Sequence, residues 1–174
     1  MTSKVTVLIP VFNAEKYIQD SLQSILNQTY THFECLIIND GSTDQTLDII
    51  KAFDSPKIKI VHQIENKGII KSLNKGLEIA QGEYIARMDA DDISHPKRLE
   101  IQVKYMQEHP DCGLCGAWFN LIGDIKNITK HPTQNDEIKT HLLFDTPFAH
   151  PSVMMRKDTM DTHKLRYQKT AYHV

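Results

Sequence analysis

The sequence has no excess of positive charge and no long hydrophobic run. Its 174 residues carry 20 Lys and Arg against 22 Asp and Glu, a formal net charge of −2. Nucleic-acid-binding domains usually carry a clustered basic surface, so we expect no nucleic-acid partner. The apolar run that follows Lys4 is too short for a signal peptide or a membrane span. We therefore expect a cytoplasmic chain, which could still work at the inner face of the membrane through peripheral association.

The chain also lacks the loops that mark several common nucleotide-binding and hydrolytic folds. It has no Walker-type lysine loop, which argues against P-loop chemistry. No G-x-G-x-x-G follows the first apolar run, so nicotinamide binding is not expected. The nucleophile elbow of α/β-hydrolases, G-x-S-x-G, is missing as well.

There are only three cysteines, an odd number that suits a reducing compartment. Cys112 and Cys115 form a C-x-x-C pair, which could indicate a redox or zinc site. No second ligand pair follows at matched spacing, however. The apolar residues around the pair favour two structural cysteines in a buried strand.

What the chain does contain is a regular alternation of short apolar runs and amphipathic stretches. Runs rich in β-branched residues predict strands over residues 4–10, 33–39, 58–62 and 83–88. Between and after them, apolar residues recur at helical spacing. This alternation predicts an α/β fold with a mostly parallel, Rossmann-like sheet and helices on both faces.

Particular residues are expected to mark the helix ends. We expect Asn13 to cap the first helix, and Ser42 with Gln45 to form a capping box before the second. Gly82 is expected to end the third helix, and Pro96 to occupy the first turn of the fourth.

The pattern becomes less regular after the fourth helix. Residues 112–122 predict a longer strand, which Gly123–Asp124 could turn into a hairpin with residues 125–129. A short helix is expected over residues 136–143, and a short strand over residues 153–155. Because no linker or internal repeat is visible, we expect one domain over the whole chain.

Polar residues collect directly after each of the first four strands. They occupy residues 10–15, 39–44, 65–68 and 89–92. The loops that follow parallel strands lie at one edge of the sheet, and open α/β sheets bind ligands in the crevice outside those strand ends. We therefore expect four polar loops to converge on one cleft.

Three carboxylates, those of Asp89, Asp91 and Asp92, lie within four positions after the fourth strand. They repel one another unless solvent or a cation relieves the repulsion. A hard divalent ion, Mn²⁺ or Mg²⁺, takes oxygen ligands and typically bridges carboxylates to a diphosphate. The alternative is an acidic turn that caps the next helix, but the position facing the other three loops favours the metal.

Other loop residues have two interpretations from the residues alone. Asp40 could accept a hydrogen bond from a base or ribose, or start a tight turn. Phe12 could stack on a base or pack at a strand end. Lys71 could meet a phosphate or be a solvated charge. Gly68 and Gly76 could permit close backbone approach, with helix packing as the other role for Gly76.

Taken together, these segments resemble family 2 glycosyltransferases, which have the GT-A fold, and in particular bacterial members that decorate surface polysaccharides. Five ordered segments carry the resemblance: Val7–Glu15, Asn39–Asp44, Asn66–Gly76, Ala86–Asp92 and His150–Met154. Five matches in order are far more specific than any one of them. The resemblance implies a nucleotide-sugar-binding half over about residues 1–110 and the start of an acceptor-binding half over about residues 111–174, apparently truncated.

The resemblance also implies which residues bind substrate and metal. The substrate-binding set is Pro10, Phe12, Asn13, Glu15, Asp40, Asn66, Gly68, Lys71, Asp89, Ala90 and Asp91. Asp40 would hold the base, expected to be uracil. Asp91 would be the more direct metal ligand, with Asp89 binding ribose and metal. Leu73 stands where many relatives carry arginine, so the diphosphate contact would fall to Lys71.

The reaction that the resemblance implies is a metal-dependent, inverting transfer. A sugar would pass from a nucleoside diphosphate sugar, expected to be a UDP-sugar, to a saccharide or lipid-linked acceptor. Family members place an acidic general base well after the D-x-D segment, and we expect it beyond Val174. Asp158 and Asp161 lie in the right half of the chain, but the sequence around them does not match.

Alternatives remain open at this point. If the base is missing, the chain would be a truncated sugar-nucleotide-binding domain without catalysis. A nucleotidyltransferase would need a glycine-rich basic loop after the first strand, which residues 10–15 do not provide. A plain α/β interaction module would bind no nucleotide. His150 could contact acceptor or diphosphate, or be a turn residue before Pro151.

Overall fold

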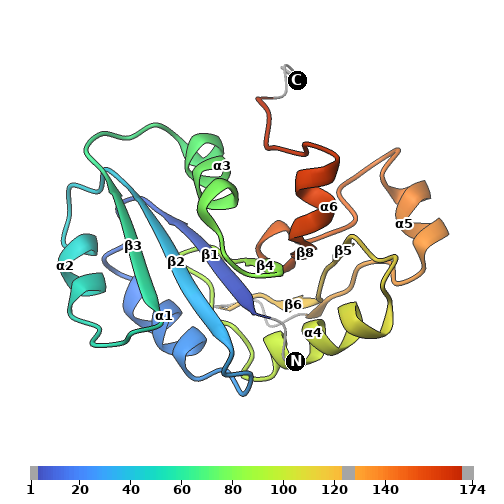
Figure 1. Cartoon of the computed structure of the whole chain (residues 1–174), viewed down its shortest axis with the longest axis horizontal. Coiled ribbons are helices and arrows are strands. Elements are labelled where there is room, and N and C mark those ends of the chain that lie inside the picture. The colour runs from blue at the N-terminus through green and yellow to red at the C-terminus, as the bar shows by residue number, and fades with distance from the viewer. Residues whose placement is uncertain (1–3, 123–127, 170–174) are drawn as a thin grey trace.

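The computed structural model describes residues 4–122 and 128–169, and its main element is a six-stranded sheet (Figure 1). The strands, in their order across the sheet, are β3 Ile58–Gln63, β2 Phe33–Asp40, β1 Val5–Val11, β4 Tyr84–Arg87, β8 Met154–Arg156 and β5 Leu114–Cys115. β3, β2, β1 and β4 run parallel, and β8 is antiparallel to both β4 and β5. The predicted mostly parallel α/β sheet is confirmed.

Strand β1 lies at the centre of the parallel part. Every one of its seven residues is buried, which explains why its sequence is a nearly continuous apolar run. β2 and β3 lie on one side of β1, and β4 returns to the other side. The strand order therefore reverses between β1 and β4, and α/β sheets form ligand crevices at such a reversal.

Helices cover both faces of the sheet, as predicted (Figure 1). They are α1 Ile18–Leu26, α2 Thr46–Lys51, α3 Ile69–Ile79, α4 Arg98–Glu108 and α6 Lys157–Thr162. Residues of α1, α2 and α4 pack with Val7 and Ile9 of β1 in one core cluster. Residues of α3 and α6 pack with Leu8 of β1 in a second cluster on the other face. Alternate residues of β1 thus anchor both layers, which fixes the strand between them.

Two of the predicted helix starts are wrong. α1 begins at Ile18, four residues beyond the position that Asn13 would cap. No side chain of Ser42 or Gln45 caps α2. Instead the backbone N of Thr46 donates to Asp44 Oδ1 at 3.0 Å.

The predicted roles of Gly82 and Pro96 also differ from the structure. α3 ends at Ile79, and Gly82 lies beyond it, packed against β1. A Cβ on Gly82 would stand 2.4 Å from the backbone N of Thr6, so close approach explains the glycine. Pro96 precedes α4 by two residues, and its carbonyl accepts a hydrogen bond from Thr29 N at 2.9 Å.

The long strand predicted over residues 112–122 is broken in two. β5 ends at Cys115, and β6 Phe119–Asn120 begins only after Gly116 to Trp118. Within this break, Ala117 N donates to Ser152 Oγ at 3.0 Å, and the same hydroxyl lies 3.0 Å from Ala117 O. A side chain 35 residues away therefore takes the backbone groups that a strand partner would use. β6 pairs antiparallel with β7 Ile128–Thr129, and the predicted Gly123–Asp124 turn lies outside the described residues.

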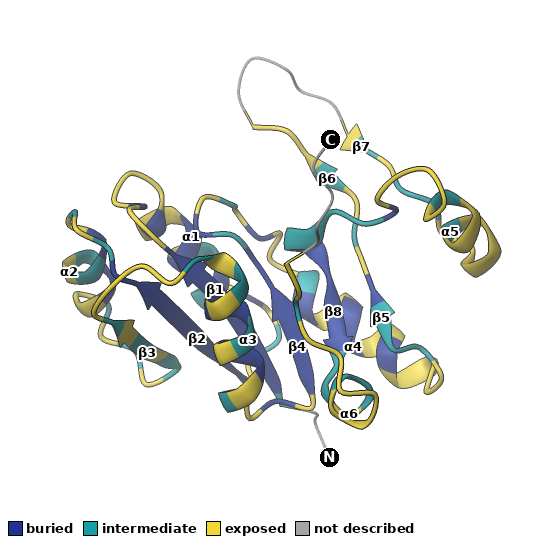
Figure 2. Cartoon of the chain, turned by 90° about the horizontal axis from the view of Figure 1, so that it is seen from above, coloured by how far each residue is buried: buried dark blue, intermediate teal, exposed yellow. Residues whose placement is uncertain are grey.

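The segment between the fourth helix and β8 packs less tightly than the sheet. The helix predicted over residues 136–143 is present as α5 Asn135–His141, and none of its residues is buried. Figure 2 shows α5, β6 and β7 projecting from the buried strands. The two cysteines of the C-x-x-C pair are free thiols, Cys115 buried in β5 and Cys112 partly buried.

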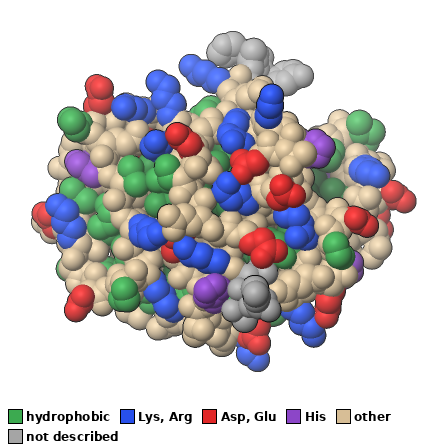
Figure 3. All heavy atoms as spheres, viewed as in Figure 1, with side chains coloured by type: hydrophobic (Ala, Val, Ile, Leu, Met, Phe, Trp, Pro, Cys, Tyr) green, Lys and Arg blue, Asp and Glu red, His purple; other side chains and the backbone are tan. Residues whose placement is uncertain are grey.

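Charges of both signs are interspersed on the molecular surface. On the face drawn in Figure 3, basic and acidic side chains alternate among the described residues rather than gathering by sign. None of the helices in residues 4–122 and 128–169 has the length and apolar run needed to cross a bilayer.

The buried carboxylate of Glu34 in β2 contacts side chains of the neighbouring strands β1 and β3. Glu34 is 4% exposed, and its oxygens accept hydrogen bonds from Thr6 Oγ1 at 2.6 Å and Gln81 N at 2.9 Å. Lys59 and Lys4 form ion pairs with it at 2.7 and 3.2 Å. Burial alone would raise the pKa of Glu34, but the hydrogen bonds from Lys59, Thr6 and Gln81 outweigh it and lower the pKa to about 2.

We expect Glu34 to make the stability of the fold depend on acid. Its folded-state pKa lies below the unfolded value, so its contribution is present above pH 4.5 and is lost as pH falls toward 2. Between pH 5.5 and pH 3, wild-type protein should lose about 2 kcal/mol more unfolding free energy than Glu34→Gln. Urea unfolding of both proteins at several pH values measures this. Equal pH slopes would contradict the assigned role.

Candidate functional site

A cleft of about 400 Å³ opens at the carboxyl ends of β1, β2 and β4, where the strand order reverses. Its lining residues are Pro10, Val11, Phe12, Asn13, Ala14, Tyr17, Asp40, Asn66, Gly68, Ile69, Ser72, Asp89, Ala90 and Asp91. The lining includes residues of all four polar loops that the sequence singled out, together with Tyr17, Ile69 and Ser72. The structure therefore brings together nine of the eleven predicted substrate-binding residues and leaves out Glu15 and Lys71.

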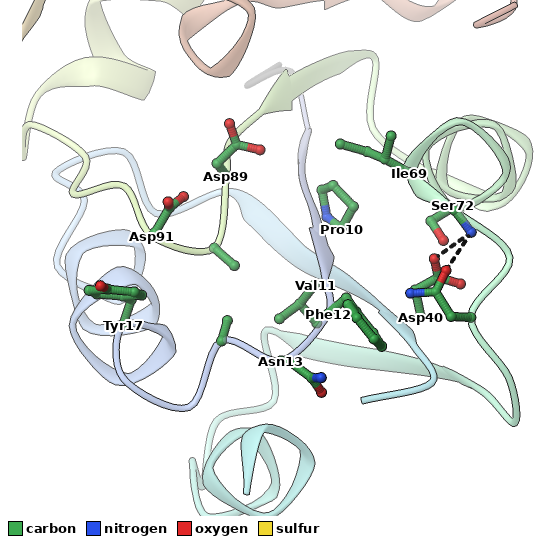
Figure 4. A pocket seen from close by; sticks show the side chains of 14 residues that line it. Pro10, Val11, Phe12, Asn13, Tyr17, Asp40, Ile69, Ser72, Asp89 and Asp91 are labelled. Carbon is green, nitrogen blue, oxygen red and sulfur yellow. Dashed lines mark hydrogen bonds between the residues drawn. The ribbon is translucent and has the colours of Figure 1, made fainter. Parts of the chain in front are cut away.

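Carboxylates face the cleft from opposite sides (Figure 4). Asp89 and Asp91 follow β4 on one side, and Asp40 ends β2 on the other, with Pro10 of β1 between them. Among the described residues that line the cleft, none is Lys or Arg. The wall is therefore rich in oxygen acceptors and poor in positive charge.

Asp40 holds the loop that follows β3. It is 3% exposed. Its Oδ1 accepts hydrogen bonds from Lys67 N and Gln63 Nε2, both at 2.9 Å, and its Oδ2 accepts one from Gly68 N at 2.8 Å. Gln63 also donates to Ser72 Oγ at 2.8 Å, which ties the same group to α3. The carboxylate thus holds the backbone of Lys67 and Gly68 beside the cleft.

Asn13 joins the loop after β1 to the loop after β2. Its φ of 50° is left-handed, a conformation that asparagine tolerates better than most residues. Thr43 N donates to Asn13 Oδ1 at 2.8 Å, and Asn13 N donates to Ser42 Oγ at 3.0 Å. This reciprocal pairing explains why Asn13 does not cap α1.

Glu15 extends this connection and points away from the cleft. Its Oε2 accepts a hydrogen bond from Gln45 N at 3.0 Å, and its own N donates to Asp44 Oδ2 at 3.1 Å. Ala14 N donates to Thr46 Oγ1 at 2.8 Å between these contacts. The carboxylates of Glu15 and Asp44 therefore join the loops after β1 and β2 through backbone N–H groups, and Glu15 does not line the cleft.

Two aromatic side chains remain open to solvent beside the cleft. Phe12 is 47% exposed and Tyr17 is 55% exposed. Figure 4 shows them on different parts of the rim, Phe12 near Asp40 and Tyr17 on the side of Asp91. An exposed ring at the edge of a cleft offers a face for a base to stack on, and the exposure of Phe12 excludes a place in the core.

The two carboxylates of the D-x-D segment have different partners. Asp89 is about one-third exposed, and both of its oxygens accept hydrogen bonds from the buried guanidinium of Arg87. Asp91 is exposed, and within the described residues its carboxylate has no hydrogen bond or ion pair. Asp92 is half-buried, and burial followed by the charges of Asp89 and Asp91 raises its pKa.

These residues can contribute to a divalent-metal site without enclosing one. Within the described residues, no three His, Cys, Asp or Glu side chains converge as a complete metal cage. Mg²⁺ typically uses one or two protein carboxylates and completes its shell with water and substrate phosphates. The unpaired oxygens of Asp91 and the spare lone pairs of Asp89 fit that pattern.

Gly68, Gly76 and Lys71 of the third segment have different positions in the structure. Gly68 directly precedes α3 at the cleft and has a φ of 88°, so its backbone conformation favours glycine. A Cβ on Gly76 would stand 2.2 Å from Leu8 Cδ1, which confirms the helix-packing interpretation. Lys71 is exposed on α3 outside the cleft lining, as a solvated charge would be.

His150 lies outside the cleft lining, at the start of the 3-10 turn His150–Ser152. Its Nε2 lies 2.9 Å from Tyr167 Oη, and the two rings meet edge to face. Burial, followed by the charge of Arg87, lowers the pKa of His150. The structure thus places this residue in a turn, paired with the C-terminal segment.

Five lining residues were not predicted: Val11, Ala14, Tyr17, Ile69 and Ser72. Tyr17 directly precedes α1 and lines the cleft from that position. Ser72 follows Gly68 by one helical turn, and that spacing could have placed it on the same face. Ile69 is exposed at the first position of α3, on the side of the cleft.

Comparison with known proteins identifies the family. The sequence matches the family described as Glycosyl transferase family 2 over residues 6–163. An uncharacterized glycosyltransferase of Haemophilus influenzae is 37% identical over an alignment of 182 positions, which covers 95% of this chain and 55% of that protein. The putative teichuronic acid biosynthesis glycosyltransferase TuaG of Bacillus subtilis is 41% identical over 68% of this chain and 47% of its own length. The chain spans about half the length of the curated relatives it matches.

Solved structures share the fold. S. aureus TarS in complex with UDP-GlcNAc superimposes with a TM-score of 0.79 at 24% identity, covering 95% of this chain and 48% of that one. The mannosyltransferase PcManGT from Pyrobaculum calidifontis, in complex with GDP-Man and Mn²⁺, gives a TM-score of 0.74 at 21% identity, over 97% and 48% of the two chains. Together with the family match over most of its length, this likeness means that the chain has the GT-A fold and belongs to glycosyl transferase family 2.

Proposed function

We propose that this cleft binds a nucleoside diphosphate sugar, a UDP-sugar in particular, with the help of a divalent metal ion, for transfer of the sugar to a saccharide or lipid-linked acceptor. The observation that carries the proposal is the charge of the cleft. Asp40, Asp89 and Asp91 line it, and none of the described lining residues is Lys or Arg. A diphosphate would be repelled by such a wall unless a cation lay between them.

Different lining residues would contact different parts of the donor. Phe12 offers a ring face to the base at the end of the cleft near Asp40. Asn66 and Gly68, held by Asp40, border the same end and suit contacts to base or ribose. At the other end, Asp89, Ala90 and Asp91 suit ribose hydroxyls and the diphosphate region. The UDP and UDP-GlcNAc complexes of TarS support uridine as the nucleoside.

Asp91, with Asp89 beside it, would hold Mn²⁺ or Mg²⁺. Such an ion, when bound, offsets negative charge on the departing nucleoside diphosphate. The Mn²⁺ complex of PcManGT supports a divalent ion in this fold. The protein's own part is to keep Asp91 free of internal partners and to hold the strand end rigid beneath it.

In an inverting transfer, a carboxylate takes the proton of the acceptor hydroxyl as that oxygen attacks the anomeric carbon from the face opposite the diphosphate. Asp158 and Asp161 are poor candidates for this base. Asp161 forms ion pairs with Lys157 and Arg166, and burial is outweighed by these contacts, which lower its pKa. Both residues belong to α6 and neither lines the cleft.

A nucleotide panel tests the proposed donor. In the presence of Mn²⁺, calorimetric titration should show UDP binding at least about tenfold more tightly than GDP or ADP, a difference near 1.4 kcal/mol. The physical reason is that the loop at Gly68 borders the end of the cleft near Asp40, where we expect the smaller pyrimidine to fit better than a purine. Equal binding of all three nucleotides would remove the uridine assignment, and binding of none would favour a plain interaction module.

Donor binding without transfer is the second candidate, because the chain spans about half of its relatives. Incubation with UDP-GlcNAc and measurement of released UDP separates the two. Release above the rate without protein supports transfer or hydrolysis by this chain. Tight binding with no release supports the binding role.

A further inference from the structure

Arg87 holds the first carboxylate of the D-x-D segment from behind the cleft wall. It is the last residue of β4, and its side chain is only 3% exposed. Its Nη1 donates to Asp89 Oδ2 at 2.8 Å, and its Nη2 donates to Asp89 Oδ1. Two parallel hydrogen bonds fix a carboxylate in orientation as well as position. Asp89 therefore presents its oxygens to the cleft in one arrangement.

The rest of Arg87 is fixed by its neighbours in the sheet. Its backbone N donates to Val153 O at 2.9 Å, and its carbonyl accepts from Arg98 Nη2 at 2.7 Å. Among the described residues, its buried Nε has no hydrogen-bond partner. The guanidinium therefore relies on Asp89 for compensation of its charge, and each side chain orders the other.

The positive charge of Arg87 lies beside several carboxylates at the end of β4. Three carboxylates stand within four positions at this strand end, and only Asp91 is free of partners within the described residues. The guanidinium offsets the charge of Asp89, which reduces the repulsion that an incoming anionic ligand meets.

We propose that Arg87 is a positioning residue of the donor site, which acts on the bound nucleotide through Asp89. It holds the Asp89 carboxylate as an oriented hydrogen-bond acceptor and offsets its charge, while Asp91 stays available. The proposal rests on the donor binding proposed above, and it predicts that the contributions of Arg87 and Asp89 to binding are not independent.

A double-mutant cycle on UDP binding tests this. Calorimetry with Mn²⁺ is run on wild type, Arg87→Met, Asp89→Asn and the double variant. Each single variant should bind UDP about tenfold more weakly, and the double variant no more weakly than Asp89→Asn alone. If the two losses multiply to about 100-fold, Arg87 acts independently and the proposal is wrong. Unchanged binding in Arg87→Met would overturn it as well.

Further variants separate positioning from loss of fold. Arg87→Lys keeps the charge but cannot bind both oxygens, so its UDP affinity should lie between those of wild type and Arg87→Met. Affinity equal to wild type in Arg87→Lys would show that the paired hydrogen bonds do not matter, and would overturn the proposal even if Arg87→Met does not fold. The double variant removes both charges, and thermal unfolding of each protein identifies a damaged fold.

Arg166→Met is the matched control, because it removes an arginine that pairs with Asp161 outside the cleft. Its UDP affinity should equal that of wild type, and a loss equal to that of Arg87→Met would make the effect non-specific and count against the proposal. The wild-type titration distinguishes failure of the proposed donor binding from failure of the role proposed for Arg87. No UDP binding by wild type removes the proposed function, whereas normal binding by both wild type and Arg87→Met removes only this inference.

Discussion

Replacing Asp91 by alanine is expected to weaken UDP binding in the presence of Mn²⁺ by about 10²-fold, or about 2.7 kcal/mol. Asp91 is the cleft carboxylate whose oxygens are free of hydrogen bonds and ion pairs within the described residues, so it is the group most available to a cation. Its removal should leave the unfolding free energy nearly unchanged, because an exposed side chain without partners contributes little. Calorimetry and urea unfolding measure the two quantities.

Asp111→Ala provides the comparison. Asp111 is an exposed aspartate in the turn after α4 and does not line the cleft. UDP affinity in that variant should equal the wild-type value. An Asp91→Ala protein that binds UDP as tightly as the Asp111→Ala protein would show that the free carboxylate has no part in donor binding.

Replacing Asp40 by alanine is expected to damage both stability and donor binding. The change removes the acceptor of Lys67 N and one of two acceptors for Gly68 N and Gln63 Nε2, which keep Asn66 Oδ1 at 3.0 Å and Ser72 Oγ at 2.8 Å. Hydrogen bonds to a charged acceptor are worth more than neutral ones, and the change removes three of them, so we expect a loss of about 2–4 kcal/mol in unfolding free energy. The loop that carries Asn66 and Gly68 should move, and UDP affinity should fall with it.

Asp54→Ala is the control for this prediction, because Asp54 is exposed in the loop before β3 and lies outside the cleft lining. Chemical denaturation of both variants gives the stability difference. If Asp40→Ala unfolds like wild type but binds no UDP, then Asp40 contacts the nucleotide directly and does not act by holding the loop.

The parallel half of the fold was predictable because its signals are local. The apolar run of β1 and the polar residues that follow each strand are visible along the chain, and parallel topology brings those loops to one edge. The positions of Asp40, Asp89 and Asp91 around one cleft follow from that topology alone. Family resemblance added the expected ligand, which no spacing could provide.

The partners of individual side chains were not predictable, because they depend on contacts between distant segments. Glu15 looked like a ligand-binding acid, yet it accepts a hydrogen bond from Gln45 N, 30 residues away. The strand expected over residues 112–122 breaks where Ser152 takes the backbone groups of Ala117. The role of Arg87 was not predictable either. It depends on the two hydrogen bonds that its guanidinium donates to Asp89, and these are visible only in the structure.

The central claim is that this acidic cleft accepts a diphosphate only when a divalent cation is present. The most direct measurement is calorimetric titration of UDP into the wild-type chain, first with Mn²⁺ and then with the metal removed by EDTA. We expect clear binding with Mn²⁺ and a loss of at least about tenfold in UDP affinity without it. Equal UDP affinity in the two conditions would contradict it.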